Sequence, residues 1–396
     1  MTAEQRDIAY ICTHLGEENA AAVHLGAVVP PIFQTSLHVF DDIEDLLGYD
    51  VEDSRGRYFY GRVDNPTTVL LEQKLAALEA ADGALCFASG MAAISAAILH
   101  AVRPGGHVVT VHNVYGPARS FLSGYLKRYG VEVSYVSGME SAEFEHAIRP
   151  NTCLFYLESP TSAVLELQDL EAVSAIARAH GIMTAIDNTW ATPIHQNPLQ
   201  LGIDIVVHTM SKYIGGHSDI IGGALCARSE IISAVKTGER ELIGGILGPF
   251  DSWLALRGLR TMPARLAQSG RSGRAVAAYL QSQARVRRVN YPGLEGTAQY
   301  ELARRQMRGG CGLLSFELDG TVEQSMAFAN RLRLFRKGVS WGGFESLVCM
   351  PMFKLGDEEA RSRNANRNLI RLYCGLEDEQ ALLEDVEDAL CASGLR

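Results

Sequence analysis

Several signals that would assign a protein to a class at once are missing from this chain of 396 residues. None of its eight cysteines forms a C-x-x-C pair, so neither a zinc knuckle nor a dithiol redox motif is indicated. It has no apolar run of roughly 18 residues, the length that a membrane-spanning helix needs. The opening MTAEQRDIAY is charged where a secretory signal would need an apolar core. We therefore expect a cytoplasmic protein with buried, reduced thiols.

An excess of positive charge is missing as well. The chain has 36 basic and 46 acidic residues and a net charge of −10, which disfavours nucleic acid as the main partner. A local basic site for a small anion remains possible. Apolar residues make up 47% and charged residues 21%, which is typical of a globular protein. The length predicts two or three domains.

Short apolar runs alternate with helical patterns in the middle of the chain. The runs are HVVTVH, VEVSYV, CLFYLES, IMTAID and DIVVHT. Asp169 should cap the helix in DLEAVSAIARAHG, and Gly181 follows its end. Apolar strands separated by helices predict a mostly parallel sheet covered on both faces, an α/β fold. Ligands of such sheets bind beyond the carboxyl ends of the strands.

Changes in pattern divide the chain into three predicted units. Residues 1–60 have little periodicity and predict an extended arm with one short helix. Residues 61–256 hold the α/β pattern, which begins with a helix from Pro66 that should stop at Gly83. Residues 257–396 predict a smaller α+β domain that starts with a long helix over 263–285.

Two charged residues follow apolar strands where ligands are expected. Asp187 ends IMTAID, and a carboxylate there is costly unless a cation faces it; a turn or capping aspartate is the alternative. Lys212 follows DIVVHT and could be a desolvated, nucleophilic amine. Taken alone, such a lysine is more often exposed at the surface.

Two further patterns are suited to an anion. Ser89 and Gly90 precede a helical run of small residues, so free N–H groups at the helix start could bind a phosphate. Arg62, in YFYGRVDNPTT, could donate two hydrogen bonds to the same kind of group. An ordinary small-residue turn and a surface loop are the alternatives. No histidine spacing indicates a metal site.

One cofactor accounts for all four features. Pyridoxal phosphate needs a lysine, a carboxylate for its ring nitrogen, an anion site for its phosphate and a ring that stacks on it.

Specific motifs extend this argument to a family resemblance. They are YGRxxNPT, ASGMAAI, VYGPAR, DNTWATP, SKYIGGHSD and SWGGFESL, and they stand along nearly the whole chain. Together they resemble the Cys/Met-metabolism family of pyridoxal-phosphate enzymes, which includes cystathionine γ-synthase, cystathionine β- and γ-lyase and methionine γ-lyase. The resemblance implies the aspartate-aminotransferase-like fold (fold type I), with a large seven-stranded, mostly parallel sheet. It also implies a homotetramer built as a dimer of dimers.

The resemblance also assigns roles to matching residues. Lys212 would bond the cofactor and Asp187 would pair with its ring nitrogen. Tyr115 would stack on the ring and assist proton transfer. The other implied contacts, all inferred from the motifs, are Gly90, Met91, Thr209 and Ser211 to the phosphate, Tyr60 and Arg62 to the phosphate from a neighbouring subunit, and Arg371 with the Ser340 region and Trp341 to the substrate.

Details within the family favour β-elimination. Members that act at the γ-carbon usually have glutamate where this chain has Val339. Trp341 and Trp190 resemble bacterial cystathionine β-lyases. Ser162 stands where an asparagine would usually contact the cofactor, and some β-lyases share that serine. The sequence thus predicts a cystathionine β-lyase that takes a small amino-acid thioether. Another reaction of the family is the alternative, and a non-catalytic relative is a remote one.

Overall fold

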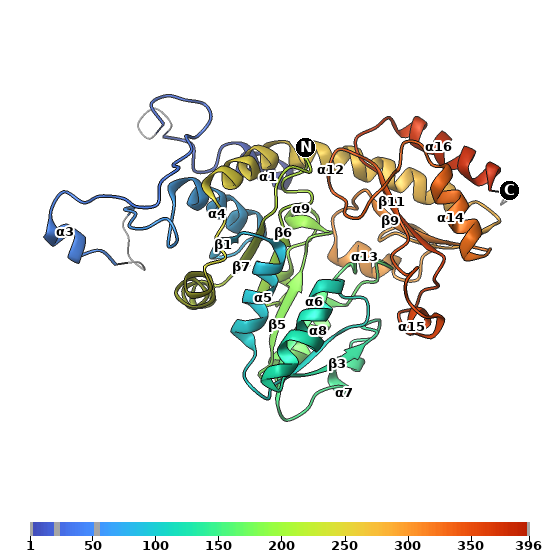
Figure 1. Ribbon diagram of the computed structural model, residues 1–396, viewed down its shortest axis with the longest axis horizontal. Helices are drawn as coiled ribbons and strands as arrows, with labels where there is room; N and C mark the ends of the chain where they lie inside the picture. The colour runs from blue at the N-terminus through green and yellow to red at the C-terminus, as the bar shows by residue number, and fades with distance from the viewer. Residues whose placement is uncertain (1–2, 20–23, 51–55, 394–396) are drawn as a thin grey trace.

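The computed structural model describes residues 3–19, 24–50 and 56–393 (Figure 1). Much of the described segment 24–50 extends from the body at one end, and the C-terminal domain lies at the other end (Figure 1). The largest sheet has seven strands in the order β1-β7-β6-β5-β4-β2-β3. These strands are β1 Gly83–Phe87, β2 His107–Val111, β3 Glu132–Val136, β4 Thr152–Glu158, β5 Met183–Asp187, β6 Ile205–Thr209 and β7 Gly223–Ala227.

The predicted fold class is confirmed by this sheet. Strands β2 to β6 run parallel, and β7 pairs antiparallel with both β1 and β6. All five apolar runs read from the sequence are strands. The sequence did not predict β1 and β7 because GALCF and GALCA are built largely of small residues with weak strand preference.

Helices and single turns cover both faces of the sheet. Asp169 caps α8 through a hydrogen bond from the Ala172 N–H, as predicted. The helix from Pro66 ends earlier than predicted: its last residue is Glu79, Ala80 adopts the left-handed cap, and Gly83 starts β1. The helices are α4 Pro66–Glu79, α5 Gly90–Ala101, α6 Gly116–Ser120, α7 Ala142–His146, α8 Leu170–Ala179, α9 Thr192–His195, α10 Ser229–Val235 and α11 Glu241–Ile243.

The C-terminal domain is built on a second, five-stranded sheet in the order β10-β11-β12-β9-β8. Its core combines apolar residues of this sheet with those of α14 and α16. Its elements are β8 Val286–Asn290, α13 Tyr300–Gln306, β9 Leu313–Leu318, α14 Val322–Arg331, β10 Arg336–Lys337, β11 Leu347–Cys349, α15 Asp357–Ser362, β12 Leu369–Tyr373 and α16 Glu379–Ala392.

One long helix, α12 Pro249–Gln281, joins the two domains (Figure 1). The sequence predicted it over 263–285, so its start was placed too late; Pro263 lies inside it rather than near its beginning. The expected boundary at 257 therefore lies within this helix. A Cβ on Gly258 would come within 2.2 Å of the Ile214 carbonyl oxygen, so α12 packs directly on the segment that follows Lys212.

The described part of the arm contains two helices, α1 Ala3–Thr13 and α3 Ile43–Leu47, where the sequence predicted one. Its apolar side chains are largely exposed, for example Val28 and Leu47. Within the described ranges, no helix is long and apolar enough to span a membrane. All eight cysteines are free thiols.

Candidate functional site

A cavity of about 370 Å³ opens at the carboxyl ends of the parallel strands. It collects residues from eight separated stretches of the chain and from both domains. Its lining is Ser89, Gly90, Met91, Tyr115, Glu158, Pro160, Ser162, Asp187, Thr189, Trp190, Thr209, Ser211, Lys212, Ile221, Val339, Ser340, Trp341 and Arg371. Most residues singled out in the sequence thus meet at one place.

Lys212 reaches into this cavity from the turn after β6. Its Nζ hydrogen-bonds the Ser340 hydroxyl and lies 5.4 Å from the centre of the Trp341 ring. Burial, together with the nearby positive charge of Arg371, lowers the pKa of Lys212 to about 8, although Asp187 opposes the shift. A lysine of this kind is unprotonated in an appreciable fraction near neutral pH, as a nucleophile or base must be.

Asp187 ends β5, is buried and lines the same cavity. Its Oδ1 accepts a hydrogen bond of 3.0 Å from the Thr189 N–H. Burial raises the pKa of Asp187, while the Thr189 hydrogen bonds and the charges of His208 and Lys212 act in the opposite direction. A buried carboxylate in this position is suited to a cationic ring nitrogen.

The start of α5 forms the anion site that the sequence suggested. Ser89 caps the helix by accepting a hydrogen bond of 3.0 Å from the Ala92 N–H. Gly90 and Met91 are its first two residues, whose N–H groups have no partner within a helix. A Cβ on Gly90 would lie 2.1 Å from the Thr209 Oγ1, so only glycine permits this close approach.

Tyr115 and Arg371 approach the cavity from opposite domains. Tyr115 stands at the N-cap of α6 with its side chain 40% exposed, and its N–H donates to Glu158 Oε2 over 2.5 Å. Arg371 extends from β12, and its Nη1 donates to the Ser162 carbonyl oxygen over 3.1 Å. An aromatic ring and a guanidinium group thus border the space above Lys212.

Tyr60 and Arg62 lie outside this cavity within the single chain. The Arg62 Nη1 donates to the Glu241 carboxylate over 3.1 Å, and the guanidinium carbon lies 5.5 Å from the centre of the Tyr60 ring. Both side chains are at least 40% exposed. The implied contact with a neighbouring subunit therefore stays a prediction.

Glu158 was missed as a site residue by the sequence analysis. It ends β4 beside Asp187 in the parallel register and is buried. The signal was available, because CLFYLES places a carboxylate after an apolar strand just as IMTAID does.

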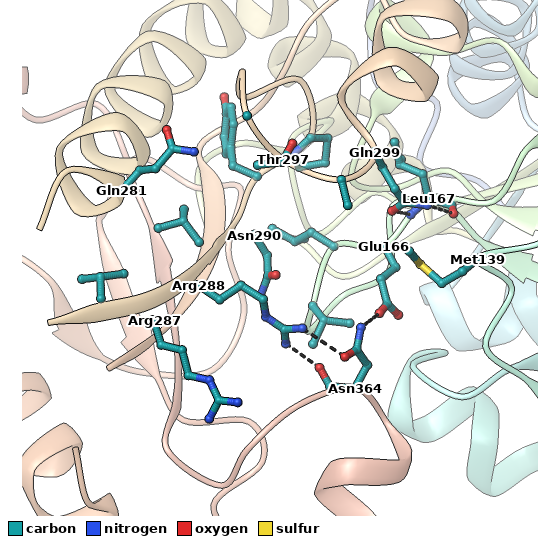
Figure 2. Close-up of a pocket in the computed structure, with 18 residues that line it drawn as sticks. Met139, Glu166, Leu167, Gln281, Arg287, Arg288, Asn290, Thr297, Gln299 and Asn364 are labelled. Atoms are coloured by element: carbon teal, nitrogen blue, oxygen red, sulfur yellow. Dashed lines mark hydrogen bonds between the residues drawn. The ribbon is translucent and has the colours of Figure 1, made fainter. Parts of the chain in front are cut away.

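A second cavity, of about 350 Å³, lies between the loop Val164–Leu167 and β8 (Figure 2). Two of its charged side chains, Glu166 and Arg288, already have polar partners. Asn364 donates to the Glu166 Oε1 over 2.5 Å, and Arg288 binds both Asn364 and Glu317. This second cavity contains no lysine and no anion site at a helix start, so we assign no chemistry to it. No cluster of three potential metal-binding side chains occurs in the part of the chain that the structure describes.

Comparison with known proteins agrees with this geometry. The model of the Cys/Met metabolism PLP-dependent enzyme family matches residues 11–391. The chain belongs to that family. Its members use pyridoxal phosphate, and the chain is accordingly a PLP-dependent enzyme of cysteine and methionine metabolism.

Individual relatives of this PLP enzyme are similar over nearly its full length. L-methionine γ-lyase of Pseudomonas deceptionensis is 39% identical, with 93% of each chain covered. Cystathionine γ-lyase of Bacillus subtilis is 37% identical, covering 92% of this chain and 94% of the relative. The crystal structure of metB from Corynebacterium glutamicum superposes with a TM-score of 0.90 at 33% identity, covering 97% and 98% of the two chains.

The residues present in this PLP enzyme fit the cofactor. The glycine at the start of α5 leaves room for a phosphate where a Cβ would meet Thr209. A lysine with a lowered pKa and a buried aspartate line the same cavity. Lys212, Asp187, Tyr115 and the α5 start would together hold pyridoxal phosphate.

Proposed function

We propose that the protein is a carbon–sulfur β-lyase that cleaves L-cystathionine to homocysteine, pyruvate and ammonia. The observation that carries the proposal is the rim of the cavity beside Lys212, formed by Val339 and Trp341. Val339 is 83% exposed, and in γ-acting members of the family a glutamate usually stands here. An apolar side chain at this point supplies no second acid–base group, which supports chemistry at the β-carbon.

The residues of the chain divide the work as follows. Arg371 can bind the α-carboxylate of the amino acid through its planar pair of donors. Lys212, with its lowered pKa, can take the proton from Cα, and either Lys212 or Tyr115 can return a proton to the departing sulfur. Pyridoxal phosphate, when bound, supplies the aldehyde for the substrate amine and the electron sink for the Cα carbanion. Water completes the release of pyruvate and ammonia.

Cleavage at the γ-carbon is the second candidate. The observation in its favour is the similarity to proteins named methionine γ-lyase and cystathionine γ-lyase. Such an enzyme would release a four-carbon keto acid from cystathionine.

Incubation of the protein and pyridoxal phosphate with L-cystathionine tests the proposal. Pyruvate with homocysteine is the expected outcome. If 2-oxobutyrate with cysteine were the main product instead, the β-lyase assignment would be wrong and the second candidate correct. A colourless protein that stays inert with added cofactor would revive a non-catalytic role.

We also propose that the active unit is a dimer within a homotetramer in the cytoplasm. Tyr60 and Arg62 lie on the exposed arm side of the molecule, where a second copy could receive them. Their proposed partner is the phosphate group at the α5 start of that copy.

A further inference from the structure

One loop residue links the backbone of Tyr115, through Glu158, to the side chain of Arg371. Ser162 lies in the segment after β4, and its carbonyl oxygen accepts the hydrogen bond from Arg371. Its N–H donates to Glu158 Oε1 over 2.6 Å, and its hydroxyl makes a short hydrogen bond to the same oxygen. The other carboxyl oxygen of Glu158 accepts from the Tyr115 N–H over 2.5 Å. A continuous path of hydrogen bonds thus runs from Tyr115 to Arg371.

This arrangement departs from what the family motif suggested for position 162. The asparagine usual there would contact the cofactor, whereas the Ser162 hydroxyl turns to Glu158. Glu158 is buried and lies in register with Asp187 on the neighbouring strand. A buried carboxyl group without hydrogen-bond donors would be costly, so its three donors are also what keeps it in place.

We propose that Ser162 and Glu158 act as one positioning unit, which fixes the backbone of Tyr115 and the guanidinium of Arg371 relative to each other. This rests on the proposed use of Tyr115 and Arg371 in catalysis. Neither member of the unit needs to touch the reacting atoms. Their effect is to set where the stacking ring and the carboxylate-binding group stand.

The charge state of Glu158 is consistent with such a structural task. Burial and the adjacent Asp187 raise the pKa of Glu158 to about 8, against the opposing hydrogen bonds of Ser162 and Tyr115. Burial thus shifts this carboxyl group toward its neutral form. Glutamine, which has the same shape without charge, is the conservative replacement.

The chain offers a matched control away from the cavity. Glu143 accepts hydrogen bonds from both the N–H and the hydroxyl of Ser137, as Glu158 does from Ser162. Neither Ser137 nor Glu143 lines the catalytic cavity. Ser137→Ala therefore removes the same kind of serine–glutamate bond without reaching Tyr115 or Arg371.

The test compares Ser162→Ala, Glu158→Gln and Glu158→Ala with that control. In the cofactor-free protein, hydrogen exchange of the Tyr115 amide should become about tenfold faster in Glu158→Ala and little faster in Glu158→Gln.

In the protein loaded with pyridoxal phosphate, Ser162→Ala should raise KM and the inhibition constant of an unreactive amino acid about three- to tenfold. The inhibition constant of the matching α-carboxamide should not change, because that ligand lacks the group that Arg371 binds.

A double-mutant cycle separates one unit from two independent residues. If Ser162 and Glu158 act together, Ser162→Ala should add almost nothing to the effect of Glu158→Ala. If the effects of the two substitutions on amide exchange and on the inhibition constant were additive, the proposal would be overturned. It would also be overturned if Ser162→Ala changed these quantities no more than Ser137→Ala does. Should Glu158→Ala fail to fold, the comparison of Ser162→Ala with Ser137→Ala still decides. The amide exchange needs no turnover, so an error in the reaction assigned to the enzyme would leave this part of the test intact.

Discussion

The Nζ of Lys212 lies 5.4 Å from the centre of the Trp341 ring, and the two residues belong to different domains. Ser340, which binds the same nitrogen, adopts φ +88°, a conformation that is unfavourable for a residue with a side chain. Gly342 follows at φ +90°, and a Cβ there would lie 2.8 Å from the Lys212 carbonyl carbon. A loop of the C-terminal domain with two residues at positive φ thus contacts the reactive lysine directly.

Replacement of Lys212 should remove both cofactor attachment and turnover. Lys212→Ala should leave no cofactor fixed to the chain after borohydride reduction, because its amine is the one in the cavity. Peptide mass mapping of the reduced wild-type protein should find the label at position 212. Lys354→Ala, at an exposed lysine, serves as control and should behave like wild type. A label on any other peptide would contradict this assignment.

The lowered pKa of Lys212 predicts how the cofactor-free protein reacts with aldehydes. The reactive form is the free amine, so the rate of pyridoxal phosphate uptake should rise with pH to a midpoint near 8. An ordinary lysine would give a midpoint above about 10. Arg371→Gln should move the midpoint upward, since it removes one of the positive charges that favour the neutral amine. Burial is the larger cause, so the midpoint should stay below that of an exposed lysine.

Gly90→Ala should weaken cofactor binding by at least about tenfold, because the new methyl group would collide with Thr209 at 2.1 Å. Fluorescence titration of the cofactor-free protein measures the dissociation constant. Gly124→Ala is the matched control, since a Cβ there meets nothing within 4 Å. Equal affinity of the two variants would argue against the α5 start as the phosphate site.

Val339→Glu should shift the product mixture from pyruvate toward 2-oxobutyrate. The new carboxylate would stand at the rim beside Lys212, where γ-acting members of the family usually carry one. Separation of the keto acids by chromatography gives the ratio directly. Val339→Gln has the same shape without the charge and should leave the ratio unchanged. A shift of equal size in both variants would assign the effect to side-chain size.

Mixing two inactive variants tests the subunit contact proposed for Arg62. Arg62→Ala and Lys212→Ala, unfolded and refolded together, should form hybrid dimers in which one of the two sites is intact. About a quarter of the wild-type activity is the expected recovery for random pairing. Each variant refolded alone should stay inactive. Without recovery in the mixture, Arg62 would have to act within its own chain.

Most of the central sheet could be predicted from the sequence because its parallel strands are short, largely apolar runs that alternate with helical patterns. The two edge-side strands β1 and β7 escaped prediction, since alanine and glycine give no strand signal and only the fold brings them into the sheet. The start of α12 was also missed: the sequence predicted this helix over 263–285, whereas it begins at Pro249 and continues through Pro263.

Single positions in the candidate site were predictable where a charged residue follows an apolar strand, as for Asp187 and Lys212. Contacts between distant segments could not be predicted. The bond between Arg371 and the Ser162 carbonyl joins residues from two domains, and no local pattern encodes it. The orientation of the Ser162 hydroxyl depends on Glu158, whose own position is set by strand register.

The continuous helix α12 has a mechanical consequence. Its 33 residues correspond to a rod of about 50 Å that rests on the turn beyond Lys212 at Gly258 and also packs against the second sheet. If the two domains rotate relative to each other, α12 must bend or one domain must slide along it. The glycine contact makes sliding costly, so we expect substrate entry to depend on small shifts of the loop carrying Ser340 and not on a wide hinge.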